Sequence, residues 1–177
     1  MDKTFLKLKR FPTLETDRLI LRELEEHDFP DFHALISDAK VNEHIQMDWA
    51  DPKEARKWFD SFKARFKEGQ GIRWAIQIKD GPCVGNFGFR DPRPEIGCIE
   101  RGLQIASPHW RHGYGREASQ KATEWLLKET PYRKVDAWIA TGNLPAIKLV
   151  EKQGFHGTGE TKLFCGLTLL RFLYPKE

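Results

Sequence analysis

The spacing of hydrophobic and polar residues predicts both strands and helices in the first third of the chain. Residues 14–24, which contain TDRLILREL, are rich in Leu and Ile and predict a strand. A short amphipathic helix is expected to begin at His27-Asp28. A second helix is expected at Asp51-Pro52, because Asp is a favoured N-cap and Pro suits the first helical position. Its apolar residues at helical spacing are Ala55, Trp58, Phe59, Phe62 and Phe66.

Three strands are expected in the middle of the chain, at residues 73–79, 82–90 and 96–106. Asp80-Gly81 separates the first two strands and is a hairpin turn signal. The sequence DPRPEIG, which separates the second and third strands, is rich in residues that interrupt regular structure. This section is therefore predicted to be an antiparallel meander.

The last third predicts a helix over residues 117–128, a strand over 134–140 and a helix over 145–153 capped by Gly154, followed by two more strands. The strands on either side of the 117–128 helix are expected to be parallel, because a helical crossover joins parallel strands. The whole pattern predicts a mixed sheet with helices on both sides, in the α/β (α+β) class.

Composition narrows the class of protein. A chain of 177 residues with 40% hydrophobic content is expected to form one domain over residues 1–177. A net charge of +3 without blocks of like charge argues against a nucleic-acid partner. The three cysteines Cys83, Cys98 and Cys165 are scattered and form no CxxC pair, which fits a reducing cytoplasm. No apolar run is long enough to span a bilayer, so a cytoplasmic protein without a membrane partner is expected.

No metal site is expected. Three histidines lie on different predicted elements, and the other two considered, His109 and His112, lie in a loop without carboxylates at ligand spacing.

The segment HWRHGYGREA, residues 109–118, carries two glycines just before a predicted helix. Gly113 and Gly115 allow close approach of a ligand to the backbone, and the N-terminus of a helix favours an anion such as a pyrophosphate. A helix entry without any ligand explains the glycine spacing equally well. The segment also satisfies GxGxxA, and Asp136 lies near the offset of a ribose-binding acid in a nicotinamide-dinucleotide fold.

Two observations argue against the dinucleotide alternative. The preceding sequence IERGLQIA mixes charged and apolar residues, and the loop SPHWRH separates it from the glycines. Asp136 also lies early in its predicted strand instead of at its end.

Several segments in order resemble the GCN5-related N-acetyltransferases (GNAT), and most closely their RimJ/RimL branch of ribosomal-protein acetyltransferases. Trp110 occupies a position where the general family has Gln or Arg and where this branch commonly has Trp. The segments that carry the resemblance are LETDRLILREL, GIRWAIQIKDGPCVGNFGFR, IERGLQIASPHW, RHGYG, REASQKATEWLL, VDAWIA and TGNLPAIKLVEKQGF.

The resemblance implies the GNAT fold, with a twisted sheet of about seven strands and a splayed parallel pair that binds coenzyme A. It implies acetyl-CoA as co-substrate, with the pyrophosphate on the turn amides and the pantetheine arm along one strand. Asn143 is implied to help hold coenzyme A, although it is equally explained as a helix N-cap. The residues implied to bind the cofactor are Leu103, Gln104, Ile105, Arg111, His112, Gly113, Tyr114, Gly115, Arg116 and Asn143.

Acetyl transfer to an amine requires a base, because a free alkyl amine has a pKa of about 10. Strand alternation places Glu100 on one face with small and polar residues, as expected for a cleft wall. An ordinary acid paired across a sheet is the alternative, and the resemblance makes Glu100 the candidate catalytic residue. Relatives often supply a Tyr or Ser that protonates the leaving thiolate, but Ala146, Leu149 and Val150 occupy that region here.

The leading hypothesis is an acetyl-CoA-dependent N-acetyltransferase that works by direct attack in a ternary complex. The acceptor is a primary amine, either a protein N-terminus or a small molecule, and the segment around Trp49 lies where relatives form their acceptor site. A non-catalytic coenzyme A-binding regulatory module and a nicotinamide-binding protein are the alternatives. The sequence is compatible with a homodimer.

Overall fold

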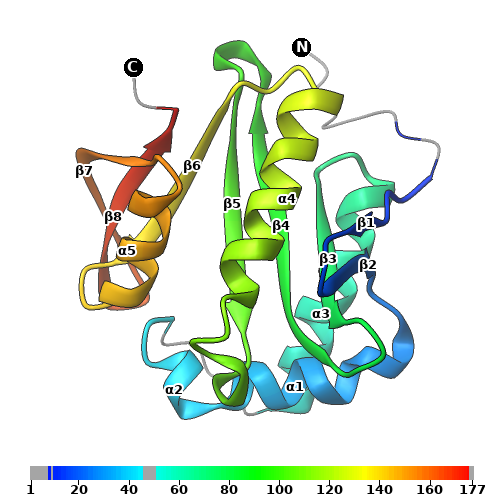
Figure 1. Cartoon of the computed structure of the whole chain (residues 1–177). Helices are drawn as coiled ribbons and strands as arrows, with labels where there is room; N and C mark the ends of the chain where they lie inside the picture. The colour runs from blue at the N-terminus through cyan, green and yellow to red at the C-terminus, as the bar shows by residue number, and fades with distance from the viewer. Residues whose placement is uncertain (1–7, 9, 46–50, 176–177) are drawn as a thin grey trace.

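A computed structural model describes residue 8, residues 10–45 and residues 51–175. It contains one eight-stranded sheet with the strand order β1-β2-β3-β4-β5-β6-β8-β7 (Figure 1). The strands are β1 (Leu14–Glu15), β2 (Leu19–Glu23), β3 (Gly71–Ile78), β4 (Cys83–Arg93), β5 (Cys98–Ile105), β6 (Lys134–Ala140), β7 (His156–Phe164) and β8 (Leu167–Tyr174). The α-helices are α1 (Phe29–Ser37), α2 (Ala39–Asn42), α3 (Pro52–Lys67), α4 (Tyr114–Glu129) and α5 (Leu144–Lys152). Short 3-10 turns cover Glu26–Asp28, Pro94–Ile96 and Ser107–His109.

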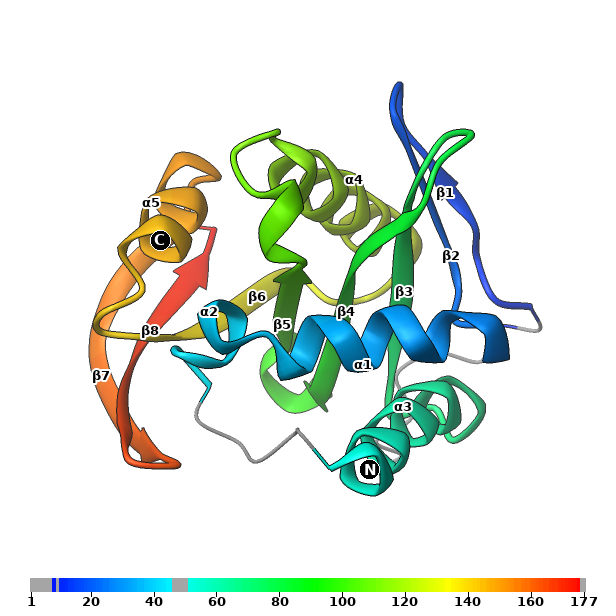
Figure 2. The same ribbon diagram turned by 90° about the horizontal axis from the view of Figure 1, so that it is seen from below.

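The helices lie on both faces of the sheet. Figure 2 shows α4 and α5 on one face and α1, α2 and α3 on the other. All neighbouring strands are antiparallel except β5 and β6, which α4 connects in parallel. The prediction of a mixed sheet is confirmed. The prediction that the strands before and after the 117–128 helix are parallel is confirmed as well. The sheet has eight strands where about seven were expected, and one of them, β1, has only two residues.

Each face of the sheet covers its own apolar cluster. Under α4 and α5 the cluster includes Trp74, Phe87 and Leu126, all fully buried. Under α1 and α3 it includes Phe32 and Phe59. Strand alternation therefore separates two layers that share one sheet, and any site on the sheet opens toward one layer or the other.

The differences from the predicted elements have local causes. The expected strand over residues 14–24 is two strands, because the Leu19 N–H donates to the Thr16 hydroxyl (2.9 Å) and closes a tight turn. The helix expected from residue 117 begins at Tyr114, directly after Gly113. The Asp51 cap is confirmed, since its carboxylate accepts from the Lys53 N–H (2.9 Å).

The sheet also excludes the nicotinamide alternative. That interpretation required a fully parallel, doubly wound sheet, whereas in the part of the chain that the structure describes only β5 and β6 form a parallel pair. Asp136, its candidate ribose acid, is fully buried and forms ion pairs with Arg93 and Arg171. Its carboxylate is therefore engaged within the sheet.

A buried ion pair fixes the start of α1 against β2. Both guanidinium Nη atoms of Arg22 donate to the carboxylate of Asp28 (2.7 and 2.8 Å), and the Glu25 N–H donates to it as well (2.8 Å). The Asp28 side chain is only 2% exposed. Burial alone would raise the pKa of Asp28, but the hydrogen bonds from Arg22 and Glu25 lower it overall.

We expect Asp28→Asn to lower the free energy of unfolding by about 3 kcal/mol at pH 7, because it leaves the Arg22 guanidinium without its carboxylate. A carboxyl group with a lowered pKa stabilises the fold above its unfolded pKa of about 3.9 and loses this effect as the pH falls through the folded value. The difference between wild type and variant, measured by urea unfolding, should therefore shrink below about pH 4.

Asp31→Asn is the matched control, since Asp31 is exposed in the first turn of α1, just after Asp28, the N-cap of that helix. A change within about 0.5 kcal/mol is expected there. Equal losses for the two variants would contradict a special role for the Arg22–Asp28 pair.

Candidate active site

The glycine turn presents backbone N–H groups at the N-terminus of α4. Gly113 is the N-cap residue with φ +83°, and Arg111 is also left-handed with φ +65°. The first helical hydrogen bond runs from the Glu117 N–H to the Gly113 carbonyl (3.0 Å). No side chain of the described residues caps the N–H groups of this turn. Together with the helix dipole, they form a site suited to an anion.

Gly115 has a different task from Gly113. A Cβ atom at Gly115 would lie 3.1 Å from Cδ2 of Leu103 and 3.5 Å from Cγ1 of Ile105. The missing side chain allows α4 to pack closely on β5. The second glycine of the motif therefore serves helix–sheet packing, and it keeps the turn close to β5.

Residues far away in the sequence hold the turn in place. Arg18, between β1 and β2, donates from Nε to Oε2 of Glu117 (2.7 Å) and from Nη1 to the His112 carbonyl (3.0 Å). The Thr16 hydroxyl donates to the other carboxylate oxygen of Glu117. The Arg18 guanidinium also lies 4.8 Å from the centre of the Tyr114 ring. The first turn of α4 is thus bound to the segment between β1 and β2, near the N-terminus of the chain. The sequence analysis did not predict these contacts.

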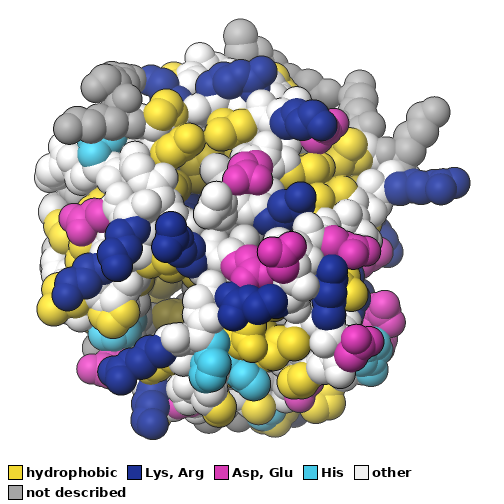
Figure 3. Space-filling view, viewed as in Figure 1, with side chains coloured by type: hydrophobic (Ala, Val, Ile, Leu, Met, Phe, Trp, Pro, Cys, Tyr) yellow, Lys and Arg dark blue, Asp and Glu magenta, His cyan; other side chains and the backbone are white. Residues whose placement is uncertain are grey.

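Strands β5 and β6 pair only at their first residues and then diverge. The parallel register covers Cys98–Lys134, Ile99–Val135 and Glu100–Asp136. Beyond Glu100, β5 has no strand partner on this side among the described residues, and Figure 1 shows the two strands splaying apart. Figure 3, in the same orientation, shows a hollow between α5 and the N-terminal end of α4.

We call the region beyond Glu100, where β5 and β6 diverge, the splay. The register with β4 decides which backbone groups of β5 face it. The N–H after Ile105 donates to the carbonyl before Gly85 (2.9 Å), which makes Ile105–Gly85 a pair without mutual hydrogen bonds. The backbone groups of Ile105 and Leu103 are therefore directed away from β4, toward the splay, whereas those of Gln104 are directed to β4. Of these three candidate residues, Leu103 and Ile105 have backbone groups suited to an added strand.

Trp110 reduces the available groups further. Its indole Nε1 donates to the Ile105 carbonyl (2.7 Å) and holds the loop that leads into the glycine turn. The bare edge of β5 is thus centred on Leu103, between the last pair with β6 and the glycine turn.

Glu100 lies at the start of the splay, on the sheet face opposite α4. It is 5% exposed, and its carboxylate accepts a hydrogen bond from Nε of Arg90 (2.9 Å) on the neighbouring strand. Lys162 Nζ lies 3.9 Å from the other carboxylate oxygen. Both the candidate base and the alternative of an acid paired across the sheet agree with this position. The nearest partners of this carboxylate are cations.

Arg101, the next residue, points to the α4 face. Its guanidinium donates to Gln153 Oε1 (2.8 Å) and lies 5.2 Å from the ring centres of both Phe87 and Phe155. Burial lowers the pKa of Arg101 to about 10, so the group stays charged at neutral pH. Gln153 also lines a cavity of about 270 Å³ between α4 and α5, together with Arg116.

Helix α5 begins at Leu144, one residue before the predicted start. The Asn143 side chain accepts a hydrogen bond from the Ala146 N–H (3.2 Å), which confirms Asn143 as an N-cap. Val150 is buried in the core and Leu149 is half-buried. None of these positions offers a hydroxyl group to a leaving thiolate.

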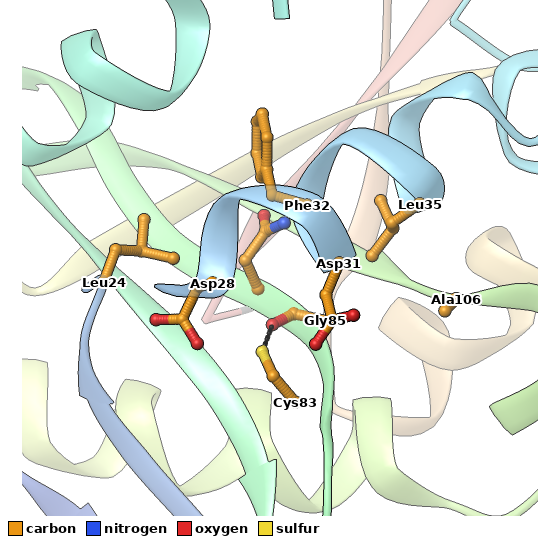
Figure 4. Close-up of a pocket in the computed structure, with 9 residues that line it drawn as sticks. Leu24, Asp28, Asp31, Phe32, Leu35, Cys83, Gly85 and Ala106 are labelled. Carbon is orange, nitrogen blue, oxygen red and sulfur yellow. Dashed lines mark hydrogen bonds between the residues drawn. The ribbon is translucent and has the colours of Figure 1, made fainter. Parts of the chain in front are cut away.

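A second, smaller cavity lies on the opposite face, beneath α1 (Figure 4). Its volume of about 20 Å³ is enough for about one water molecule. Asp28 and Cys83 line it, and the Cys83 thiol donates to the Gly85 carbonyl (3.5 Å). It is too small to accept a substrate.

Comparison with known proteins identifies the family. The family model described as "Acetyltransferase (GNAT) domain" matches residues 18–156. The chain therefore belongs to the GNAT acetyltransferase family. Members of this family use acetyl-CoA, and the predicted family is confirmed.

Relatives and structural neighbours agree with this assignment. Uncharacterized N-acetyltransferase YoaA of Bacillus subtilis (strain 168) is 30% identical over 151 residues, which cover 84% of this chain and 85% of YoaA. The Salmonella typhimurium acetyl transferase that modifies the N-terminal serine of ribosomal protein L7/L12 superimposes with a TM-score of 0.82 at 14% identity, over 94% of this chain and 100% of that one. RimL in complex with coenzyme A gives a TM-score of 0.78 at 15% identity, over 93% and 98% of the two chains.

Some expected features concern absences or lie outside the described residues. The described residues contain no group of three or more His, Cys, Asp or Glu side chains arranged to hold a metal ion. Among these same residues, no helix is long and apolar enough to cross a membrane. Trp49, expected near the acceptor site, lies outside the described residues.

We expect Glu117→Gln to loosen the glycine turn, because the uncharged amide binds the Arg18 guanidinium more weakly. Burial alone would raise the pKa of Glu117, but hydrogen bonds from Thr16 and Arg18 lower it overall. The stabilisation is therefore present above the unfolded pKa of about 4.3 and is lost as the pH falls through the lower folded value. A loss of about 1 kcal/mol in urea unfolding at pH 7 is expected.

Glu129→Gln provides the control at the other end of α4, where the carboxylate is 3.5 Å from Lys128 at the surface. It should leave the free energy of unfolding within about 0.5 kcal/mol of wild type. If Glu117→Gln also stayed within that range, the contact between Arg18 and the turn would make no contribution to the free energy of unfolding.

Proposed function

We propose that this GNAT enzyme transfers the acetyl group of acetyl-CoA to a primary amine by direct attack in a ternary complex. The acceptor is a protein N-terminus or a small-molecule amine. The observation that carries the proposal is the bare edge of β5 around Leu103, directly beside the uncapped N-terminus of α4. An extended ligand with a pyrophosphate at one end fits this combination of an unpaired strand and an anion site.

The residues suited to hold coenzyme A lie along one path. The pyrophosphate would meet the amides of the turn, residues 111–116, whose backbone is held by Arg18 and Trp110. The pantetheine arm would follow β5, with its amide groups toward the backbone of Leu103. Asn143 lies at the start of α5, across the splay, and combines its capping role with this position.

When bound, acetyl-CoA supplies the activated thioester. Transfer forms a bond between the amine nitrogen and the acetyl carbon, breaks the carbon–sulfur bond, and releases a proton from the amine. Glu100 lies at the start of the splay on the face opposite α4 and is the proposed base. Because Arg90 holds its carboxylate, a water relay to Glu100 suits the geometry better than direct contact.

The described part of the chain offers no Tyr or Ser at the α5 positions that often serve relatives as general acid. We propose that the coenzyme A thiolate takes its proton from solvent. RimL, a ribosomal L7/L12 alpha-N-protein acetyltransferase, and the Salmonella typhimurium neighbour that modifies the N-terminal serine of L7/L12 favour a protein N-terminus among the possible amines. The test is acetyl-CoA-dependent mass gain of amines from a panel of N-terminal peptides, amino acids and polyamines.

We expect Gly113→Val to raise the dissociation constant for acetyl-CoA at least about tenfold, since Val is strained at φ +83° and its Cβ atom would lie 3.3 Å from Nη2 of Arg18, which holds the turn. Gly159→Val is a matched control on the distant strand β7, because Gly159 has φ +81° and a Cβ atom there would meet no other atom within 4 Å. Calorimetric titration should show normal affinity for the control. Equal affinity in both variants would contradict the anion site at the turn.

We expect Glu100→Gln to lower kcat about 100-fold or more at pH 7, with acetyl-CoA affinity nearly unchanged. The defect should shrink as the pH rises and the amine loses its proton unaided. Glu95→Gln removes an exposed acid just before β5 and should leave the rate unchanged. Near-normal turnover of Glu100→Gln, with a verified acceptor, would leave Glu100 only its structural ion pair.

A further inference from the structure

One arginine lies across three strands beside the splay. Arg73 of β3 is opposite Gly88 of β4, and Gly88 is opposite Gly102 of β5. A Cβ atom would lie 2.7 Å from Cδ of Arg73 at Gly88, and 2.8 Å from its Nη1 at Gly102. The two glycines leave this row of the sheet bare, so the Arg73 side chain crosses β4 and brings its guanidinium to β5.

This guanidinium has only neutral partners among the described residues. It donates from Nε to Oδ1 of Asn86 (2.8 Å), from Nη2 to Oε1 of Gln104 (3.2 Å), and from Nη1 to the Gly102 carbonyl (3.3 Å). Arg73 is 8% exposed and stacks 4.6 Å from the centre of the Phe62 ring. Burial, with the nearby charges of Arg90 and Arg65, lowers its pKa well below the ordinary value. A buried cation without a carboxylate partner lowers stability. Such a cost is expected where the cation binds an anionic ligand.

The surroundings of Arg73 are cationic as well. The Arg65 guanidinium of α3 lies 5.1 Å from the centre of the same Phe62 ring that Arg73 contacts. Arg90 of β4 is opposite Glu100, two residues before Gly102. The charges of Arg65 and Arg90 lower the pKa of Arg73. Arg65 is half-buried, and burial together with the charge of Arg90 lowers its pKa too. Glu100 is already paired with Arg90, and Lys162 approaches that same carboxylate. The exposed Asp91 carboxylate, 3.8 Å from Nε of Arg90, is the remaining acid of this group.

The position of the cluster relates it to the acceptor. Gly102 lies two residues beyond Glu100, where the pairing with β6 ends. Arg73 reaches it on the face opposite α4, whereas the glycine turn lies at the N-terminus of α4. An amine that meets a thioester in the splay approaches from the face that coenzyme A leaves open. It would then pass the cluster formed by Arg65, Arg73 and Arg90.

We propose that the acceptor amine carries a carboxylate close to its amino group, and that the cluster of Arg65, Arg73 and Arg90 binds this carboxylate. The inference rests on the proposed function and specifies its substrate class. Most N–H groups of Arg73 are engaged, so it acts mainly as a fixed positive charge. The half-buried Arg65 guanidinium supplies N–H donors, and Arg90 adds those N–H groups that do not bind Glu100. The same charges disfavour polyamines and other acceptors with several cations.

The test uses acceptors that differ only in the carboxylate. The carboxylate near the amine can be that of a free amino acid or the side chain of an N-terminal acidic residue. One arm therefore compares free amino acids with their carboxamides. The other arm compares peptides of sequence Asp-Ala-Ala-amide with Asn-Ala-Ala-amide. Release of coenzyme A thiol gives kcat/KM, and product masses verify the transfer. We expect the acid to exceed its amide at least about tenfold in one of the two arms, mainly through KM.

Two variants test the cluster itself. Arg73→Gln should bring the ratio of acid to amide close to one while acetyl-CoA affinity is kept. If this variant does not fold, Arg65→Gln decides instead, because that side chain is half-buried and forms no ion pair within the described part of the chain. Arg65→Gln should lower the ratio at least about threefold. Lys67→Gln, an exposed cation at the end of the same helix, should leave the ratio unchanged.

The outcomes separate this inference from the proposed function. Equal turnover of acids and amides in both arms would overturn the inference and leave the acetyltransferase proposal intact. Turnover of no amine at all would contradict the proposed function. Calorimetric titration of the same acids and amides into protein saturated with coenzyme A would then decide the inference. Tighter binding of the acids supports it, and equal or absent binding overturns it.

Discussion

The end of the pairing between β5 and β6 is the constraint on which the rest of the site depends. Both strands must be held firmly at Glu100 and Asp136, because one residue later they diverge. Asp136 is fully buried and binds Arg93 from β4 and Arg171 from β8, so one carboxylate ties β6 to strands on both of its sides. A buried carboxylate with two guanidinium partners is costly to disturb. The pairing therefore ends at a fixed place, and the bare edge of β5 begins there.

Strand alternation then gives the two sides of β5 different properties. Leu103 and Ile105 point to α4, where Gly115 lets the helix approach closely enough to place its N-terminal turn beside the strand. Gly102 and Gln104 point the other way and contact the Arg73 guanidinium. Glycine serves opposite purposes on the two faces, since Gly115 admits a helix and Gly102 admits a charged side chain. A single extended strand thus separates a cofactor side from an acceptor side.

Patterns that are local in sequence were predictable, and contacts between distant segments were not. Alternation placed Glu100 and Gln104 on one face, and capping residues located the starts of α3 and α5, because these features depend on a few neighbouring residues. The tie between Arg18 and Glu117 joins residues 99 positions apart and leaves no local signal. The orientation of the Gln104 backbone required the register with β4, which hydrophobic spacing does not specify. The path of Arg73 over Gly88 to Gly102 depends on two registers at once.

Two buried arginines at the splay carry a desolvation cost and supply positive charge to the site. Arg73 and Arg101 lie on opposite faces of the sheet, and neither forms an ion pair with a carboxylate in the described residues. Asn86 and Gln153 supply neutral oxygens, and the rings of Phe62, Phe87 and Phe155 cover the guanidiniums, which offsets part of the desolvation cost. Apolar side chains would fill these positions at lower cost. A positive potential on both sides of the splay suits a reaction in which a thiolate departs on one side and, as proposed, an acceptor carboxylate binds on the other.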